Sequence, residues 1–137
     1  MYIFDSTQQK MDNLNDRMDK HVTVVFFLAP WCKFCKDLKP KLESVQNSFK
    51  NSKLDGTIAS VSENDITNLK YKKTLKGYPT ISLFKDGEYK DDYNGPREKS
   101  ALRQYLLDIF KKNQQRSLGN ISISKSIRDG RNKGWVG

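Results

Sequence analysis

The chain has 137 residues, of which 36% are hydrophobic and 30% are charged, and its formal net charge is +9. This length fits one domain with a single core and is short for two. The longest apolar run, residues 22–31, is well below the roughly 20 residues that a membrane span needs, so no transmembrane helix is expected.

Positive charge gathers toward the C-terminus. Residues 111–137 hold seven Lys or Arg against one Asp and carry +6 of the +9. Because the sequence after Lys112 is polar and rich in glycine, we expect a domain over residues 1–112 and a basic, flexible tail over residues 113–137. Residues 121–123 alternate like an edge strand, and three apolar residues are candidates for docking the tail: Ile127, Trp135 and Val136.

The beginning of the chain and its cysteine content bear on the compartment. Residues 1–20 carry both charge signs and lack the apolar stretch of about 7–15 residues found in signal peptides. Two cysteines are too few for the disulfide framework of small secreted domains. We therefore expect a reducing compartment, the cytoplasm.

The first half of the chain predicts two strands and two helices. Residues 2–4 fit a short strand, and a helix is expected from about 6 to 19, with Ser6 and Gln9 as a capping box. Residues 22–28 are β-branched and aromatic without alternation, which is typical of a strand buried on both faces. From 32 to 50 the apolar residues recur at helical spacing, and Pro40 within this helix predicts a kink.

The second half predicts three strands and two more helices. Residues 57–61 fit a strand, and Ser62 with Asp65 suggests the cap of a short helix. Asp86-Gly87 predicts a hairpin between strands at 81–84 and 88–93, and residues 97–112 fit a last helix. The resulting order, β-α-β-α-β-α-β-β-α, predicts an α/β fold with a mixed sheet between helices.

Three separated motifs carry a family resemblance. Residues 29–35 read Ala-Pro-Trp-Cys-Lys-Phe-Cys, residues 77–80 read Gly-Tyr-Pro-Thr, and residues 93–97 read Tyr-Asn-Gly-Pro-Arg. In this order they resemble the thioredoxin superfamily over about residues 20–110, and the last motif resembles the catalytic domains of protein disulfide isomerases. The resemblance implies a thioredoxin fold, a three-layer α/β/α arrangement with a mixed sheet of four to five strands, and no cofactor.

The two cysteines are the candidate catalytic residues. Two thiols separated by two residues at the start of a helix can form a reversible disulfide. The backbone N–H groups and the dipole of the helix should stabilise a thiolate on Cys32, and Lys33 adds a positive charge, whereas Phe34 adds apolar surface. The resemblance implies that Cys32 is exposed and attacks a substrate disulfide, and that Cys35 is buried and resolves the mixed disulfide.

The resemblance also assigns roles to four other residues. It implies that Pro79 is a cis-proline facing the cysteines, that Tyr78 lies in the substrate groove, and that Trp31 shields the thiols. It further implies that Arg97 approaches the second cysteine and lowers its pKa. Pro79, Trp31 and Arg97 also have plainer interpretations, since prolines occur at strand edges, tryptophans fill cores and arginines begin helices on solvated faces.

One expected feature of the family is absent from the sequence. A buried acid usually stands six residues before the first cysteine, where this chain has Phe26, and the lysine paired with that acid, expected near Ala59 or Ser60, is also missing. Losing both avoids an unpaired buried charge. Without an acid or base near Cys35, release of the mixed disulfide should be slower.

Three functions remain open from the sequence. The first is a thiol–disulfide oxidoreductase acting on protein thiols and disulfides, in a direction that the motif does not reveal. The second is a binding module with little redox turnover, whose groove and basic tail hold an acidic protein or make weak, non-specific contact with nucleic acid. The third, a zinc site, is disfavoured because the two cysteines and His21 supply at most three of four ligands, so no metal is expected.

Overall fold

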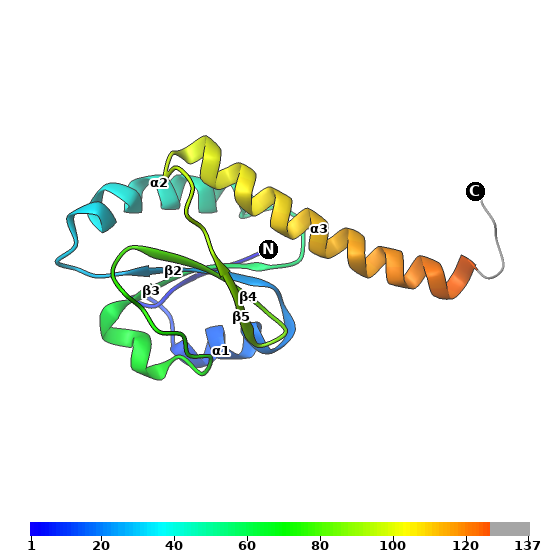
Figure 1. The fold of residues 1–137 in the computed structure, drawn as a ribbon, viewed down its shortest axis with the longest axis horizontal. Coiled ribbons are helices and arrows are strands. Elements are labelled where there is room, and N and C mark those ends of the chain that lie inside the picture. Colours follow the sequence, from blue (N-terminus) through cyan, green and yellow to red (C-terminus); the bar gives the residue numbers. More distant parts are fainter. Residues whose placement is uncertain (127–137) are drawn as a thin grey trace.

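A computed structural model of the protein describes residues 1–126, with side chains described through residue 115. Five strands form one mixed sheet in the order β1-β3-β2-β4-β5 (Figure 1). The first three of these neighbours run parallel, and β4 and β5 are each antiparallel to the preceding neighbour. The strands are β1 (Tyr2–Asp5), β2 (Thr23–Leu28), β3 (Thr57–Ser62), β4 (Thr80–Lys85) and β5 (Glu88–Asp92).

Helices cover both faces of this sheet. The helix α1 (Met11–Lys20) and the 3-10 helix η1 (Glu63–Asn68) lie on one face, and α2 (Lys33–Phe49) and α3 (Lys99–Ser126) lie on the other (Figure 1). The three layers confirm the predicted α/β architecture, with five strands in the sheet.

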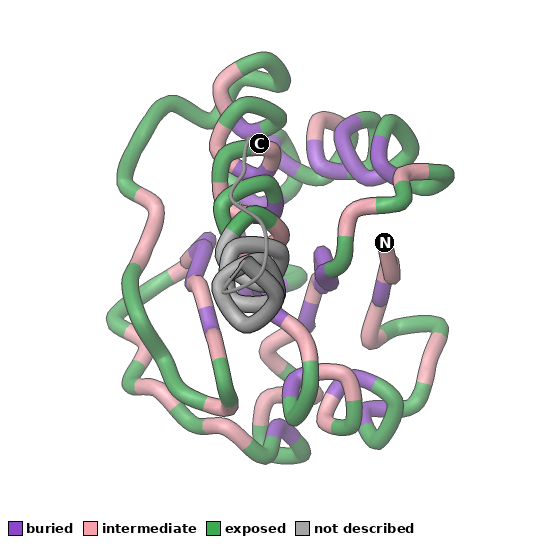
Figure 2. Tube along the Cα trace, turned by 90° about the vertical axis from the view of Figure 1, so that its right-hand side faces the viewer, coloured by how far each residue is buried: buried purple, intermediate pink, exposed green. Residues whose placement is uncertain are grey.

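The central strand β2 divides the core into two halves. Val24 and Phe26 point to the side of α2 and α3, whereas Val25 and Phe27 point to the side of α1. Figure 2 shows the consequence, with buried residues on the inward sides of the helices and exposed residues outside. Each buried aliphatic or aromatic side chain contributes about 1.5–3 kcal/mol. Because β2 is packed on both faces, the loop that follows it starts from a buried strand.

The start of α1 differs from the prediction. The helix begins at Met11 rather than near residue 6, and its N-cap residue, Lys10, makes no side-chain capping bond. The predicted capping box is wrong because its members satisfy other backbone groups: Ser6 Oγ accepts from the N–H of Ser62 at 2.8 Å, and Gln9 Oε1 accepts from the N–H of Asp5 at 2.9 Å. The first of these contacts joins the end of β1 to the end of β3, and the second closes the turn after β1.

Two other local predictions have mixed outcomes. The short helix after β3 forms as the 3-10 helix η1, without a side-chain cap from Ser62. The hairpin between β4 and β5 is confirmed, with Asp86 at φ 54° and Gly87 at φ 74°. Pro40 lies inside α2, and the kink there stays a prediction.

The last helix is longer than predicted. It starts at Lys99 and continues through Ser126, so its expected end at residue 112 is wrong, and residues 121–123 lie in the helix instead of forming a strand. Its first part packs on the sheet through Leu102, Leu106 and Phe110. The expected anchors Ile127, Trp135 and Val136 lie outside the described residues, and the division into a domain and a tail stays a prediction.

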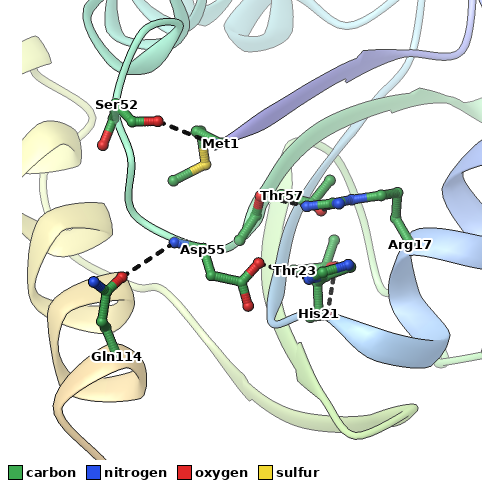
Figure 3. Close-up of polar contacts among 9 residues, drawn as sticks. Met1, Arg17, His21, Thr23, Ser52, Asp55, Thr57 and Gln114 are labelled. Carbon is green, nitrogen blue, oxygen red and sulfur yellow. Dashed lines mark hydrogen bonds and ion pairs between the residues drawn. The ribbon is translucent and has the colours of Figure 1, made fainter. Parts of the chain in front are cut away.

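A polar cluster closes the amino ends of the parallel strands. Arg17 of α1 donates to Thr57 Oγ1 at 3.0 Å and to the carbonyl of Gly56 at 2.9 Å. Nearby, His21 Nδ1 lies 2.6 Å from Asp55 Oδ1, and the side chain of Gln114 in α3 accepts from the N–H of Asp55 (Figure 3). This end of the sheet is therefore tied together by side chains from several elements.

Candidate active site

The two cysteines stand where β2 passes into α2. Cys32 is the N-cap residue of α2, and its N–H donates to the carbonyl of Ala29 at 3.1 Å. In turn, the N–H of Cys35 donates to Sγ of Cys32 at 3.2 Å. A side-chain acceptor at this position satisfies one of the N–H groups that a helix leaves unpaired in its first turn. The sulfur of Cys32 therefore lies at the positive end of the helix dipole.

Cys32 is more buried than the resemblance implied. The residue is 5% exposed, against 3% for Cys35, so the expectation of an exposed first cysteine needs correction. The reason is local packing, because both cysteines pack with Ala29, and Leu28 and Tyr78 cover the group. Sγ of Cys32 also donates to the carbonyl of Tyr78 at 3.4 Å. Both cysteines are free thiols.

The environment of Cys35 favours its protonated form. Burial is the largest cause, and together with the neighbouring Cys32 it raises the pKa of the Cys35 thiol from 9.0 to about 11. The backbone of Ala29 and the positive charge of Arg97 act in the opposite direction. Arg97 thus lowers the pKa of Cys35, in the direction the resemblance implied, although other effects outweigh it.

Aromatic side chains form an exposed rim beside the thiols. Trp31 is 67% exposed and Phe34 is 63% exposed, whereas Tyr78 is half-buried. The rings of Trp31 and Tyr78 meet edge to face, with centroids 5.8 Å apart. At this exposure Trp31 is not a core residue. Exposed apolar side chains that lie together are typical of contact surfaces.

A residue that local sequence does not reveal binds the Trp31 ring. Nε1 of Trp31 donates to Oε1 of Glu63 at 2.8 Å. Glu63 begins η1 and is 32 residues away from Trp31 in sequence, so only the folded structure brings them together. Burial raises the pKa of Tyr78, and the charges of Glu63 and Cys35 add to this effect.

The segment before β4 faces the cysteines as predicted. The peptide bond between Tyr78 and Pro79 is cis, and Pro79 is buried. A pocket of about 190 Å³ extends from Pro79 to Arg97 and includes Thr80 and Tyr93 in its lining. Arg97 itself is exposed. Lys33, the first residue of α2, is also exposed, so its charge lies outside the core. The structure thus brings Tyr78, which precedes Pro79, to the thiols and leaves Lys33, Phe34 and Arg97 on the surface. The shielding of the thiols by Trp31 stays a prediction.

Phe26 lies in the core below the motif. It is fully buried and packs on the α2 side of the sheet, opposite Ser60 of β3.

In the part of the chain with described side chains, no three His, Cys, Asp or Glu residues gather closely enough to hold a metal ion. Among the same described residues, no helix has both the length and the apolar character to cross a bilayer.

Comparison with known proteins identifies the family. Residues 5–108 match the family model described as Thioredoxin. The chain belongs to the thioredoxin family. This membership accounts for the five-stranded mixed sheet, the cysteine pair at the start of α2 and the cis-proline beside it.

Relatives of the chain include proteins of the disulfide isomerase type, which carry thioredoxin domains. Protein disulfide-isomerase A4 of Mus musculus is 30% identical over 120 residues, which cover 87% of this chain and 19% of that protein. Protein disulfide-isomerase of Ricinus communis is 35% identical over 98 residues, which cover 69% of this chain and 20% of that protein. The thioredoxin-family chain therefore spans about a fifth of the length of these relatives.

A solved structure agrees with this placement. The structure of the first two thioredoxin domains of Naumovozyma dairenensis Eps1p superposes with a TM-score of 0.61 at 27% identity, covering 69% of this chain and 36% of that one. The fold predicted from the three motifs is thus confirmed.

Proposed function

We propose that this thioredoxin-family protein is a thiol–disulfide oxidoreductase that exchanges the disulfides of protein substrates through Cys32 and Cys35. One observation carries the proposal: Sγ of Cys32 stands at the start of α2, 3.2 Å from the backbone nitrogen of Cys35 and 3.4 Å from the carbonyl of Tyr78. A thiol at a helix N-terminus is well placed to react as a thiolate.

The first step is attack by Cys32. Its thiolate attacks one sulfur of a substrate disulfide, and a bond forms between the two sulfurs. The substrate S–S bond breaks, and its electron pair leaves on the second substrate sulfur, which takes a proton from solvent. The hydrogen bond from the Cys35 N–H stabilises the negative charge on Sγ of Cys32 before the attack.

The second step is resolution by Cys35. The thiol loses its proton, and its sulfur attacks Cys32 in the mixed disulfide, so that a Cys32–Cys35 bond forms. The bond between Cys32 and the substrate breaks, and the substrate leaves as a thiolate that is then protonated. The protein is oxidised by two electrons and the substrate is reduced by two, and the reverse sequence oxidises a dithiol substrate.

The residues around the thiols have separate roles in this proposal. Trp31, Phe34 and Tyr78 contact apolar side chains of the substrate, which their exposure and partial exposure allow. Pro79 fixes the backbone next to Tyr78. Lys33 provides a positive charge beside the thiolate, and a cation there stabilises the reduced form. We therefore expect a reduction potential above the value of about −270 mV that is typical of thioredoxin.

Two matched substitutions test the function. We expect Cys32→Ser to abolish the reduction of a peptide disulfide, and Cys35→Ser to accumulate a covalent complex between Cys32 and the peptide, visible by mass spectrometry. A redox titration of the wild-type pair, with the pH dependence of Cys32 alkylation, then gives the direction and the reactivity. Undiminished exchange by Cys32→Ser would overturn the proposal, and a potential below about −270 mV would overturn the expected direction.

A second function is a partner-holding module with secondary redox turnover. The exposed rings of Trp31 and Phe34 favour it, because they can bind a protein whether or not the thiols react. In this case Cys32→Ser keeps the partner while Trp31→Ala loses it. Contact of the basic C-terminal residues with an acidic protein or with nucleic acid is a separate proposal, tested by salt-sensitive retention that truncation after Lys112 removes.

A further inference from the structure

A pocket of about 320 Å³ reaches Cys35 from the edge of the sheet. It lies between the first turns of α2 and the carboxyl ends of β1 and β3. Since one water molecule occupies about 30 Å³, the pocket has room for several. Its polar and charged lining comes from Asp5, Thr7, Lys36, Lys39, Ser60 and Ser62, and Cys35 lines it from α2.

Strand register places Asp5 on the same face of the sheet as the cysteines. Asp5 pairs with Ser60 in parallel register, and Ser60 pairs with Phe26 of β2. Directly paired residues point to one face of a sheet, and Phe26 packs against the α2 side. The carboxyl ends of parallel strands meet at one edge, so Asp5, the last residue of β1, stands at the edge where the cysteine loop leaves β2.

The hydrogen bonds of Asp5 leave part of its carboxylate available. The N–H and the hydroxyl of Thr7 both donate to Oδ1 of Asp5, at 2.9 and 2.7 Å. No described residue donates to Oδ2. Asp5 is half-buried, so one oxygen is held by the turn after β1 and the other can meet solvent in the pocket.

Cys35 needs a proton acceptor that its immediate neighbours do not supply. The residue is 3% exposed, and the group that contains it consists of Cys32 and Ala29, with Leu28 and Tyr78 packed against them, so it holds no carboxylate. Even an ordinary thiol, with a pKa near 8.5, is mostly protonated at neutral pH. The proton must therefore leave before or during the attack on the mixed disulfide, and the pocket offers a route to a carboxylate.

We propose that Asp5 accepts the proton of Cys35, through water in this pocket, when Cys35 resolves the mixed disulfide. The inference rests on the proposed function. The thiol proton passes by water to Oδ2 of Asp5 as the Cys35 sulfur bonds to Cys32, the bond between Cys32 and the substrate breaks, and the substrate leaves as a thiolate. Asp5 then returns the proton to the solvent or to the departing thiolate.

The surrounding charges fit this transfer. Lys36 and Lys39 line the pocket, and their positive charges stabilise the negative charge as it moves from Asp5 to the sulfur. The other titratable or charged groups around Cys35 are Cys32 on the same helix turn, Tyr78 before β4 and Arg97 before α3. These groups do not line the pocket.

Reaction with a symmetric aromatic disulfide, 5,5′-dithiobis(2-nitrobenzoic acid), separates the two steps in one experiment. Attack by Cys32 releases a first coloured thiolate, and resolution by Cys35 releases a second. For Asp5→Asn we expect the first release to be unchanged and the second to slow about tenfold or more at pH 7, since positioned acid–base groups contribute roughly 10²–10⁴-fold. The difference should shrink as hydroxide takes over at high pH.

Matched variants distinguish proton transfer from a structural role. Asp37→Asn removes the same charge from an exposed position in α2 that does not line the pocket, and it should leave both releases unchanged. Asp5→Glu should restore part of the second release and its pH profile. If Asp5→Asn does not fold, Asp5→Ser removes the carboxylate and keeps an oxygen for the turn with Thr7.

The outcomes separate the two proposals. If Asp5→Asn releases the second coloured thiolate with the same rate and pH profile as Asp37→Asn, the role of Asp5 is overturned. The proposed oxidoreductase function then still stands. A wild-type protein that gives a first release and no second would overturn resolution by Cys35, and the role of Asp5 with it.

Discussion

The two ends of the parallel strands β1, β3 and β2 contrast with each other. At the amino ends, charged and polar side chains bind one another and nearby backbone groups, as in the contacts of Arg17 with Thr57 and Gly56 (Figure 3). At the carboxyl ends, Trp31 and Phe34 are exposed, and two thiols lie just below them. At the amino ends, polar groups are thus paired within the protein. At the carboxyl ends, exposed aromatic rings and two thiols are available for contact with other molecules.

This difference indicates that the amino end contributes mainly to stability and that the carboxyl end carries the reactive groups. Ligands of open α/β sheets bind at the carboxyl ends of the strands, and the cysteine pair follows that rule. Substitutions at the amino end should therefore lower the free energy of unfolding and leave disulfide exchange per folded molecule unchanged. Four predictions test or refine this contrast, from the largest expected effect to the smallest.

The largest effect is expected at Gly56, at the amino end. Its φ is 152°, and a Cβ there would lie 2.4 Å from two ring carbons of the buried Phe110. Strain and overpacking together should make Gly56→Ala lower the free energy of unfolding by about 3 kcal/mol, measured by urea denaturation. Gly77→Ala is the control, because a Cβ there has no atom within 4 Å, and it should cost under about 1 kcal/mol. Equal losses in the two variants would contradict the prediction.

The next effect belongs to the carboxyl end and depends on pH. The pKa of Cys35 is raised from 9.0 to about 11, so the folded protein holds this proton more tightly than the unfolded chain. Its stabilising contribution is complete below pH 9 and is lost as the pH rises to 11, by less than about 3 kcal/mol for two pH units. The reduced wild type should therefore lose more stability than Cys35→Ala between pH 8 and 11. Parallel pH curves for the two proteins would show that burial of this thiol has no such effect.

At the amino end, Arg17→Met removes two hydrogen bonds and a cation over the Tyr2 ring, which lies 5.0 Å from the guanidinium. The hydroxyl of Thr57, which is fully buried, loses its donor. We expect a loss of about 2 kcal/mol in the free energy of unfolding and an unchanged exchange rate. Lys20→Met, an exposed lysine of the same helix, is the control and should change little. A fall in the exchange rate of folded Arg17→Met would break the separation between the two ends.

The smallest effect is expected at the sheet edge, away from both ends. Lys73 Nζ lies 2.7 Å from Asp92 Oδ2, and Ser82 donates to the same carboxylate. Burial alone would raise the pKa of Asp92, but the bonds from Lys73 and Ser82 outweigh it and lower the pKa. The contribution is therefore present above pH 4 and is lost as the pH falls further.

Lys73→Met should accordingly cost about 1 kcal/mol at pH 7 and less at pH 2, measured by thermal unfolding. The exposed pair of Lys90 and Glu88, 3.1 Å apart, provides the control, and Lys90→Met should cost under about 0.5 kcal/mol. A loss at pH 2 as large as that at pH 7 would contradict the assignment to Asp92.

Local patterns in the sequence predicted most of the sheet and the reactive pair. β2 is recognisable from an unbroken run of β-branched and aromatic residues, and α2 from Leu38, Leu42, Val45 and Phe49 at helical spacing, all of which are buried. The motif residues predicted the cis bond before Pro79 as well. These features depend on neighbours in sequence or on a family pattern.

The misses depend on contacts between distant residues. Ser6 and Gln9 were read as a helix cap, but Ser6 bonds to Ser62, 56 residues away, and so α1 starts later. Local sequence does not reveal the contact of Glu63 with Trp31, which are 32 residues apart, or the pocket that Asp5 and Cys35 both line, which depends on the strand order β1-β3-β2. The long α3 was missed because residues after 112 lack an apolar stripe, which is what the prediction relied on. The reducing compartment stays a prediction.

The length of α3 has a consequence for how the protein can be used by other molecules. The helix begins next to α2, where Glu98 contacts Lys41, and runs away from the side of the cysteine loop to end at Ser126 (Figure 1). At 1.5 Å per residue, the helix backbone extends about 18 Å beyond Gln114, whose side chain still bonds to Asp55. Whatever is attached beyond Ser126, including a fluorescent label or a fused protein, starts far from the thiols. One molecule can therefore be tethered at its far end while a second protein occupies the cysteine side.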